Sequence, residues 1–369
     1  MYSRERIELA LNHKQPDRTP RFEYVLFSSV ADRIIGSKYY DYSCDEAAWL
    51  EYAADVGWEN ALRKYVRDRL DIVAALGHDM LYVVPNPLPS AVKGNMKQIA
   101  GEKKENSAYM PDDPEERIKK KNYEREEALS ELIKDSNFEV YIYLQEEMKR
   151  RGVDLPVLAP AYWHGIWTNV DLMETMLIEP ETAEWHFKLA TKEAAAYVGK
   201  YLSLGIKMIG VGGDFAGNRL LISPESYRKF IMPEIRILSK MIHEAGGWAI
   251  NTSDGNLWPV IEDFLIGCNV DGYLEIDMRA GMDLAKLKKE YGASITFLGN
   301  MDCGEILSFN TPEQIRKYTI KCLEDGMGDG GHIFCASNAI TDSVPLCNYI
   351  AMVNAYNEFF GLSEIIWRN

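Results

Sequence analysis

The stretch IKMIGVGGDFAGNRLLISPESYRKFIMP, residues 206–233, decides the fold. It begins with an apolar run, residues 206–211, that predicts a strand buried on both faces, as strands of parallel sheets are. The run ends in two glycines and Asp214, and a short polar connection leads to Ser-Pro-Glu at 223–225. That tripeptide is typical of a helix start, because it supplies an N-cap, a proline at the first helical position and an acidic first turn. The stretch therefore predicts one βα unit with an acid at the C-terminal tip of its strand.

The same unit recurs along the chain. A helical pattern over residues 3–13 comes first, and Thr311 to Gln314 forms a capping box before one of the later helices. Eight strands, each followed by a helix, predict a single α/β domain over residues 1–369, a (β/α)8 TIM barrel with an N-terminal helical extension. An open doubly wound sheet is the alternative. The expected strands cover 19–27, 80–84, 156–161, 206–212, 248–252, 270–276, 295–298 and 332–336; the expected later helices cover 136–151, 170–202, 224–245, 257–266, 283–291, 312–326 and 346–360.

The composition changes after the second expected strand. Residues 86–133 are highly charged and low in large aliphatic side chains. This charged insertion is expected to be either a solvated excursion or a lid over the site.

The bulk composition excludes several classes of function. The chain has 369 residues, of which 47% are hydrophobic, and a net charge of −15, which argues against binding to nucleic acids or anionic membranes. Its six cysteines lie far apart without a CxxC pair, as in reduced cytosolic proteins. The N-terminus has no apolar signal segment, and no run is long enough to span a bilayer. A cytoplasmic protein is therefore expected.

Acidic and amide side chains recur at the expected strand tips. A barrel directs all its tips to one basin, and carboxylates with few neighbouring arginines suit proton transfer or metal coordination better than they suit binding of a polycarboxylate. Aromatic residues at the tips would line a flat apolar pocket. Any one of these residues alone is equally explained as a helix cap or as core packing. We expect catalytic roles for Asp79, His164, Asp214 and Glu275, and substrate-binding roles for Glu23, Tyr24, Phe215, Asp254, Asn300 and Asn338.

Several segments together resemble the superfamily of uroporphyrinogen decarboxylase and the corrinoid-dependent methyltransferases related to it. They cover nearly the whole chain in the family's order, and the resemblance implies a (β/α)8 barrel that is often paired as a homodimer. In the decarboxylases the position that Asp79 matches holds pyrrole N–H groups. The segments are SRERIELALNHKQPDRTP from residue 3, LDIVAALGHDMLYVV from 70, GDFAGNRLLISPESYRKFIMP from 213, LGNMDCGEIL from 298 and SNAITDSVPLCNYIAMVNAYNEF from 337.

The chain departs from both branches of that superfamily. The arginine-rich motif of the decarboxylases is absent after the first strand, and their C-terminal histidine falls on Asn338. Thiol-methylating members bind zinc at the positions of Thr252, Asp254 and Asn338, none of which is a soft ligand, so no thiolate-type zinc site is expected. Whether a metal is bound through oxygen and nitrogen ligands stays open.

The methyltransferase branch fits these residues better. The function expected is transfer of a methyl group from a small O-methyl aromatic or N-methyl compound to cobalamin, a corrinoid, carried by a partner protein. A protonated carboxyl or histidine would assist the leaving group. A decarboxylase acting on a tetrapyrrole or a smaller acid is the first alternative, and a non-catalytic tetrapyrrole- or corrinoid-binding protein is the second.

Overall fold

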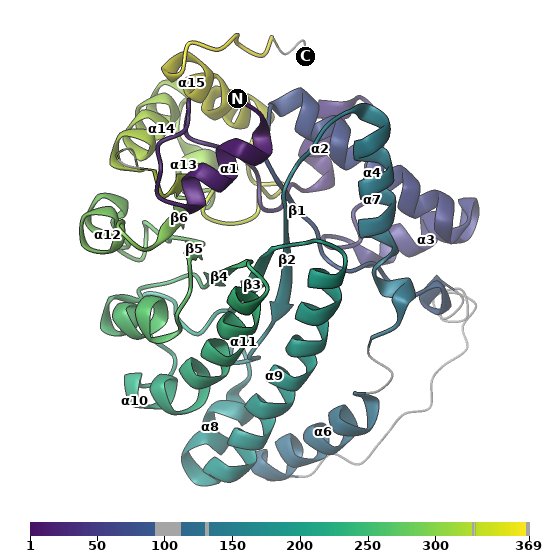
Figure 1. The fold of residues 1–369 in the computed structure, drawn as a ribbon, viewed down its shortest axis with the longest axis vertical. Helices are drawn as coiled ribbons and strands as arrows, with labels where there is room; N and C mark the ends of the chain where they lie inside the picture. The colour runs from purple at the N-terminus through teal and green to yellow at the C-terminus, as the bar shows by residue number, and fades with distance from the viewer. Residues whose placement is uncertain (93–111, 130–132, 327, 329, 367–369) are drawn as a thin grey trace.

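One parallel sheet runs through the computed structural model, which describes residues 1–92, 112–129, 133–326, 328 and 330–366 (Figure 1). Seven strands follow one another around the sheet in chain order, and every neighbouring pair is parallel. The α/β class and the barrel-like arrangement expected from the sequence are confirmed. The strands are β1 (Leu81–Tyr82), β2 (Val157–Tyr162), β3 (Met208–Val211), β4 (Trp248–Thr252), β5 (Gly272–Leu274), β6 (Thr296–Leu298) and β7 (His332–Ile333).

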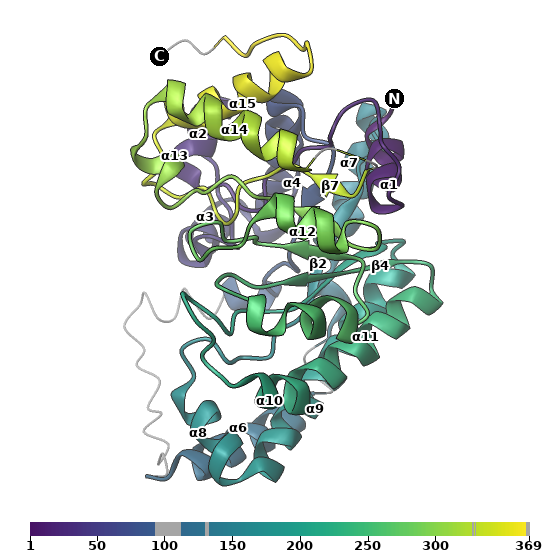
Figure 2. The same cartoon turned by 90° about the vertical axis from the view of Figure 1, so that its left-hand side faces the viewer.

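Helices wrap the outside of this sheet (Figures 1 and 2). Helix α9 packs against β2, and α11 packs against β3 and β4. None of the helices in the described ranges is long and apolar enough to cross a membrane. The helices are α1 (Ser3–Leu11), α2 (Ser28–Ile35), α3 (Glu46–Val56), α4 (Trp58–Leu76), α6 (Pro114–Ala128), α7 (Glu139–Arg151), α8 (Val170–Ile178), α9 (Pro180–Ser203), α10 (Pro224–Ser226), α11 (Met232–Glu244), α12 (Leu284–Tyr291), α13 (Ile306–Phe309), α14 (Pro312–Gly326) and α15 (Leu346–Phe359), with 3-10 turns η1 (Asp135–Asn137) and η3 (Trp258–Val260) and π turns η2 (Tyr227–Ile231) and η4 (Asp263–Gly267).

The predicted helix starts form as the sequence indicated. The Ser223 hydroxyl accepts a hydrogen bond of 3.1 Å from the Ser226 N–H. At α14 the Thr311 hydroxyl accepts from the Gln314 N–H at 3.4 Å, while the Gln314 side chain accepts from the Thr311 N–H at 3.0 Å. The helix expected over 257–266 forms as one uninterrupted helical stretch over residues 258–267, which begins with the 3-10 turn η3 and ends with the π segment η4.

The first predicted strand, residues 19–27, is not a regular strand. It makes isolated parallel bridges instead, from Arg21 to Phe334 and from Leu26 to Ile340. On its other side the Asp79 N–H donates to the Arg21 carbonyl at 2.7 Å, so the segment lies between the edges formed by β7 and β1. Pro20 explains the irregular pairing, because it has no N–H to donate to a continuous ladder. The eighth position of the barrel is therefore occupied, although only seven strands are regular.

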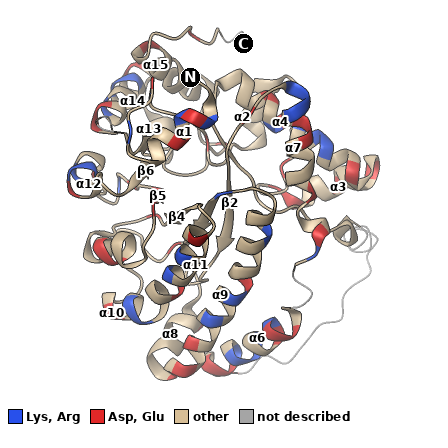
Figure 3. Ribbon diagram, in the orientation of Figure 1, with Lys and Arg blue, Asp and Glu red and all other residues tan. Residues whose placement is uncertain are grey.

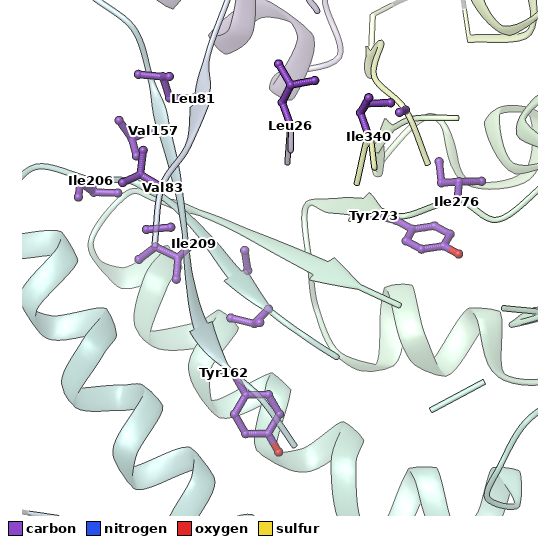
Figure 4. Close-up of a cluster of buried hydrophobic side chains, with 14 of the residues drawn as sticks. Leu26, Leu81, Val83, Val157, Tyr162, Ile206, Ile209, Tyr273, Ile276 and Ile340 are labelled. Carbon is purple, nitrogen blue, oxygen red and sulfur yellow. The ribbon is translucent and has the colours of Figure 1, made fainter. Parts of the chain in front are cut away.

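Strand alternation separates two hydrophobic cores. Even-numbered residues of β1 to β6 point into the barrel, together with odd-numbered residues of the β7 segment, and α1 packs across the same core. The other set points outward against the helices. Figure 4 shows part of the outer set, with Leu81, Val83, Val157 and Ile209 grouped where β1, β2 and β3 run side by side. The inner core is formed by Ile7, Ala10, Leu11, Phe22, Met80, Leu158, Met208, Ile250, Leu274, Leu298, Ile333 and Cys335.

Charged side chains lie mainly on the outer helices (Figure 3). Helix α6, the described helix of the charged insertion, packs on α8 and α9. Its Arg125 pairs with Glu193 of α9, and its Arg117 pairs with Asp171 of α8 at 2.7 Å. Residues 93–111 and 130–132 of the insertion lie outside the described residues, so the choice between a lid and a solvated excursion stays a prediction.

An ion-pair cluster fixes the N-terminal end of the barrel. The Asp79 carboxylate is fully buried and accepts from Arg6 at 2.6 Å and from Arg18 at 2.7 Å. The Ser3 hydroxyl and the Arg21 N–H also donate to it. Because α1 carries Arg6 and Asp79 precedes β1, this cluster ties the N-terminal helix to the sheet.

We predict that Asp79→Asn lowers the free energy of unfolding by about 3 kcal/mol or more, because it leaves the Arg18 guanidinium without its buried carboxylate and removes one of the two carboxylates, Asp79 and Asp17, that pair with Arg6. Urea unfolding of the purified variant measures this. Asp154→Asn is the matched control, since Asp154 binds Arg4 with similar geometry at the surface, where 63% of its side chain is exposed, and such pairs contribute about 0–1 kcal/mol. Equal losses in the two variants would contradict the assignment of Asp79 as the anchor.

Candidate active site

A cavity of about 390 Å³ opens at the C-terminal ends of the strands. Strands β1 to β5 all contribute to its wall, together with the segment after Arg21 and the loop after β7. Its lining in the described part of the chain contains two carboxyl groups, those of Asp214 and Glu275, and no lysine, arginine or histidine. A third carboxyl group, that of Asp254, lies behind the wall in contact with Asp214. We call this cavity the basin; it is lined by Tyr24, Val25, Phe27, Ser43, Cys44, Tyr82, Leu158, Pro160, Tyr162, Trp163, Gly210, Gly212, Gly213, Asp214, Thr252, Leu274, Glu275, Asn338 and Ala339.

Two of the carboxyl groups are linked through the loops after β3, β4 and β7. The Asp254 N–H donates to the Asp214 carboxylate at 2.9 Å, and the Asn338 side-chain amide donates to the Asp254 carboxylate at 2.6 Å. The close contact of the β3 and β4 tips depends on Gly212, since a Cβ there would lie 2.4 Å from the Thr252 nitrogen. The result is a fixed chain of polar contacts across the mouth of the barrel.

The remaining carboxyl group belongs to Glu275, just after β5. Its backbone has φ of 73°, a left-handed conformation that side chains other than glycine rarely adopt and that costs about 1–3 kcal/mol. The side chain is buried, with 6% exposed, and it faces the basin. Strain of this kind at a buried acid is typical of functional sites.

Burial raises the pKa of all three acids. The pKa of Asp254 rises to about 7, because burial and the neighbouring Asp214 both disfavour its charged form, while the Asn338 hydrogen bond works in the opposite direction. Burial likewise raises the pKa of Asp214. The pKa of Glu275 lies well above its usual range through burial and through repulsion from Asp254 and Asp214. At neutral pH this cluster therefore holds at least one proton.

Aromatic rings form the rest of the wall. The rings of Tyr24 and Tyr82 meet edge to face with their centroids 4.4 Å apart. Trp163 lies at the rim, with 55% of its surface exposed. Both tyrosines are on the inward face of the barrel, which is why their rings reach the basin.

Two of the ten predicted site residues point away from the basin because of their position in the strand pattern. Asp79 precedes β1 and therefore lies at the N-terminal end of the barrel, where the ion pairs described above occupy its carboxylate. Glu23 lies between Phe22 and Tyr24, which both face into the barrel, so its own side chain faces outward. Its carboxylate accepts a hydrogen bond from the Ala336 N–H at 3.4 Å. Burial raises the pKa of Glu23 to about 8. The expectation that these two acids face the same bowl as Asp214 is wrong.

Three further predicted residues lie near the basin but do not line it. His164 is buried, with Nε2 2.6 Å from the Gly213 carbonyl and Nδ1 3.3 Å from the Ile166 nitrogen, so both ring nitrogens are occupied. Burial lowers its pKa to about 4, which keeps the imidazole neutral. Phe215 stacks on the Tyr227 ring at 4.7 Å inside the core, and Asn300 is buried beyond β6. Of the predicted residues, Asp214, Glu275, Tyr24 and Asn338 line the basin, and Asp254 lies behind its wall, bonded to two of them.

Sequence reasoning missed three lining residues. Tyr82 could have been predicted from the sequence, because it lies two residues after Met80 and so faces the same, inward side of the strand. Ser43 and Cys44 carry none, since they reach the basin only through the packing of the helical region after Arg21. No group of three or more histidine, cysteine or acidic side chains in the described residues has the arrangement of a metal site.

The family can now be stated. The sequence model for uroporphyrinogen decarboxylase (URO-D) matches residues 165–359, more than half of the chain. The chain belongs to the uroporphyrinogen decarboxylase family. Its matched segment includes three of the four predicted residues that line the basin, with Tyr24 outside it.

Relatives of this family member include both decarboxylases and a methyltransferase. It is 24% identical over 187 residues to uroporphyrinogen decarboxylase from Coxiella burnetii strain RSA 493, covering 49% of this chain and 48% of that protein. It is 26% identical over 192 residues to the methylated-thiol–coenzyme M methyltransferase from Methanosarcina mazei, covering 52% of this chain and 47% of that protein. The chain therefore spans about half the length of the curated relatives it matches.

A solved structure of a methyltransferase from Methanosarcina mazei is similar over almost the whole chain. The TM-score is 0.67 with 18% sequence identity, covering 98% of this chain and 99% of that one. At this identity the similarity shows the fold. It supports the TIM-barrel arrangement.

We predict that Asp254→Asn changes how stability depends on pH. Because the folded-state pKa of Asp254 is raised from 3.8 to about 7, the folded protein retains a proton that the unfolded chain releases, so native stability falls as pH rises between these values. The variant lacks this loss, and its stability relative to the native protein rises by roughly 2–4 kcal/mol from pH 4 to pH 7. Urea unfolding across that range measures it, with Asp55→Asn on the exposed face of α3 as control. A constant difference would contradict the raised pKa.

Proposed function

We propose that this protein transfers a methyl group from a small methylated compound, an O-methyl aromatic or an N-methyl compound, to a corrinoid carried by a separate protein. One observation carries the proposal: two carboxyls with raised pKa values, Asp214 and Glu275, line the basin beside aromatic rings, a third, Asp254, contacts Asp214 from behind, and no lysine or arginine is found in the described lining. The family's methyltransferase relative supports the reaction type.

The carboxyl cluster supplies the proton that such a reaction needs. When the methyl group leaves, the bond's electron pair stays on the donor's oxygen or nitrogen, and a protonated carboxyl neutralises that developing charge. Asp254 has a pKa near the working pH, which is the best value for a general acid. Asn338 holds this carboxyl in place through its 2.6 Å hydrogen bond.

The corrinoid enters this proposal as a second substrate, presented by its carrier protein at the open end of the barrel. Reduced corrinoid supplies a strong nucleophile, so the basin has only to position the donor and assist the leaving group. The rings of Tyr24 and Tyr82, which meet edge to face, form an aromatic surface against which a flat or methyl-rich donor can pack. Trp163 lies where the basin opens to solvent.

The same basin suits a polycarboxylate decarboxylase poorly. A tetrapyrrole with several acidic side chains would need guanidinium partners, and its carboxylates would be repelled by Asp214, Asp254 and Glu275. Arg21, the arginine nearest to the first tip, is buried against the carbonyls of Leu76 and Gly77 instead. The family's decarboxylase chemistry is therefore the less favoured function for this chain.

The test incubates the protein with a reduced corrinoid protein and a panel of methoxylated aromatics and methylated amines, and follows the corrinoid absorbance. We expect methylation with at least one donor. Glu275→Gln should lower the rate by about 10²–10⁴, the usual contribution of an acid–base group.

Glu290→Gln on the exposed face of α12 is the matched control and should leave the rate unchanged. Porphyrin formation from uroporphyrinogen without corrinoid methylation would support the decarboxylase alternative. Absence of both reactions would support a non-catalytic binding protein.

A further inference from the structure

We infer that the basin binds its methyl donor as a cation, a methylated ammonium group held by Asp214 and Glu275 against the aromatic wall, with Asp254 adding negative charge from behind Asp214. The inference takes from the proposed function only that the ligand is a methyl donor. The binding that it predicts can be measured without any methyl transfer.

The charge balance of the basin is the first argument. Two carboxyls, those of Asp214 and Glu275, line a cavity of about 390 Å³ whose described lining contains no lysine, arginine or histidine, and Asp254 lies directly behind Asp214. At the other end of the barrel the buried carboxylate of Asp79 is paired with Arg6 and Arg18. A ligand that brings a positive charge would complete the basin in the same way.

Glu275 gives an independent indication. Its carboxyl is more than nine-tenths buried and lines the cavity, and none of the described lysines or arginines forms an ion pair with it. Only the Tyr24 hydroxyl is placed to hydrogen-bond it. Its strained backbone, with φ of 73°, holds the group in the basin against the local preference of the chain.

The aromatic wall favours an ammonium with methyl groups over a bare one. Faces of tyrosine and tryptophan rings attract cations, and they attract methylated ammonium groups without offering hydrogen bonds. Tyr24, Tyr82 and Trp163 all line the basin. A tetrahedral methylated nitrogen thus meets carboxyls on one side and rings on the other.

The chemistry balances for such a donor. When one methyl group passes to the corrinoid, a new bond forms to its carbon and the old C–N bond breaks. The electron pair of that bond stays on nitrogen, so a quaternary ammonium becomes a neutral tertiary amine. The amine lone pair can then take the proton held by the carboxyl cluster. No oxidant or reductant is consumed in this step.

The test compares choline with its neutral carbon isostere, 3,3-dimethylbutan-1-ol, by titration calorimetry on the full chain. We expect choline to bind at least about tenfold more tightly. Its affinity should rise between about pH 6 and pH 8 with release of protons, because a bound cation favours the ionised carboxyls. The neutral alcohol should show no such dependence.

The pH dependence of choline binding is assigned to the carboxyls because few other titratable groups lie near them. The tyrosines and the cysteines among them have raised pKa values, since burial disfavours their charged forms, and so they stay neutral over this range. The titratable groups that act on the cluster besides its three members are Tyr24, Tyr82, Tyr273, Asp277, Cys303 and Cys335.

Glu275→Gln should reduce the preference for choline without weakening the neutral alcohol, and Glu290→Gln should change neither affinity. Equal or tighter binding of the alcohol overturns the inference, as does failure of both choline and tetramethylammonium to bind below about 10 mM. Cation binding without methyl transfer from any donor would instead contradict the proposed function alone. Transfer from a neutral methoxylated aromatic, with no cation preference, would contradict this inference alone.

Discussion

Strand alternation in a closed parallel sheet is the constraint on which the rest of this structure depends. Each strand has to bury one face against helices and the other inside the barrel, so a shift of one position exchanges the two environments. Glu23 and Tyr24 show the consequence, since neighbours in sequence lie on opposite sides of the wall. The basin is formed where the inward faces end and the chain leaves the sheet.

The fold was largely predictable because its signals are local and repeated. The apolar runs at 206–211 and 248–252 and the capping residues Ser223 and Thr311 each specify an element without help from distant contacts. The segment 19–27 was harder, because Pro20 breaks its pairing while its place between β7 and β1 is set by the closure of the sheet.

The site was only partly predictable, and the reason is geometric. Acids that follow a strand, such as Asp214 and Glu275, reach the basin as expected, whereas Asp79 precedes its strand and Glu23 lies on the outward face. Proximity to a tip also does not distinguish a lining residue from a packing one, as His164 and Phe215 illustrate. Ser43 and Cys44 depend on how the N-terminal helices settle on the barrel, which no local pattern encodes.

At Glu275 the left-handed backbone conformation destabilises the fold, while the side chain supplies a carboxyl group to the basin. A glycine there would adopt the left-handed conformation without steric penalty, and the chain would fold to the same barrel with a gain of roughly 1 kcal/mol. That substitution would also remove the Glu275 carboxyl group from the lining of the basin. The glutamate is therefore held at a cost in stability, which is typical of residues at functional sites.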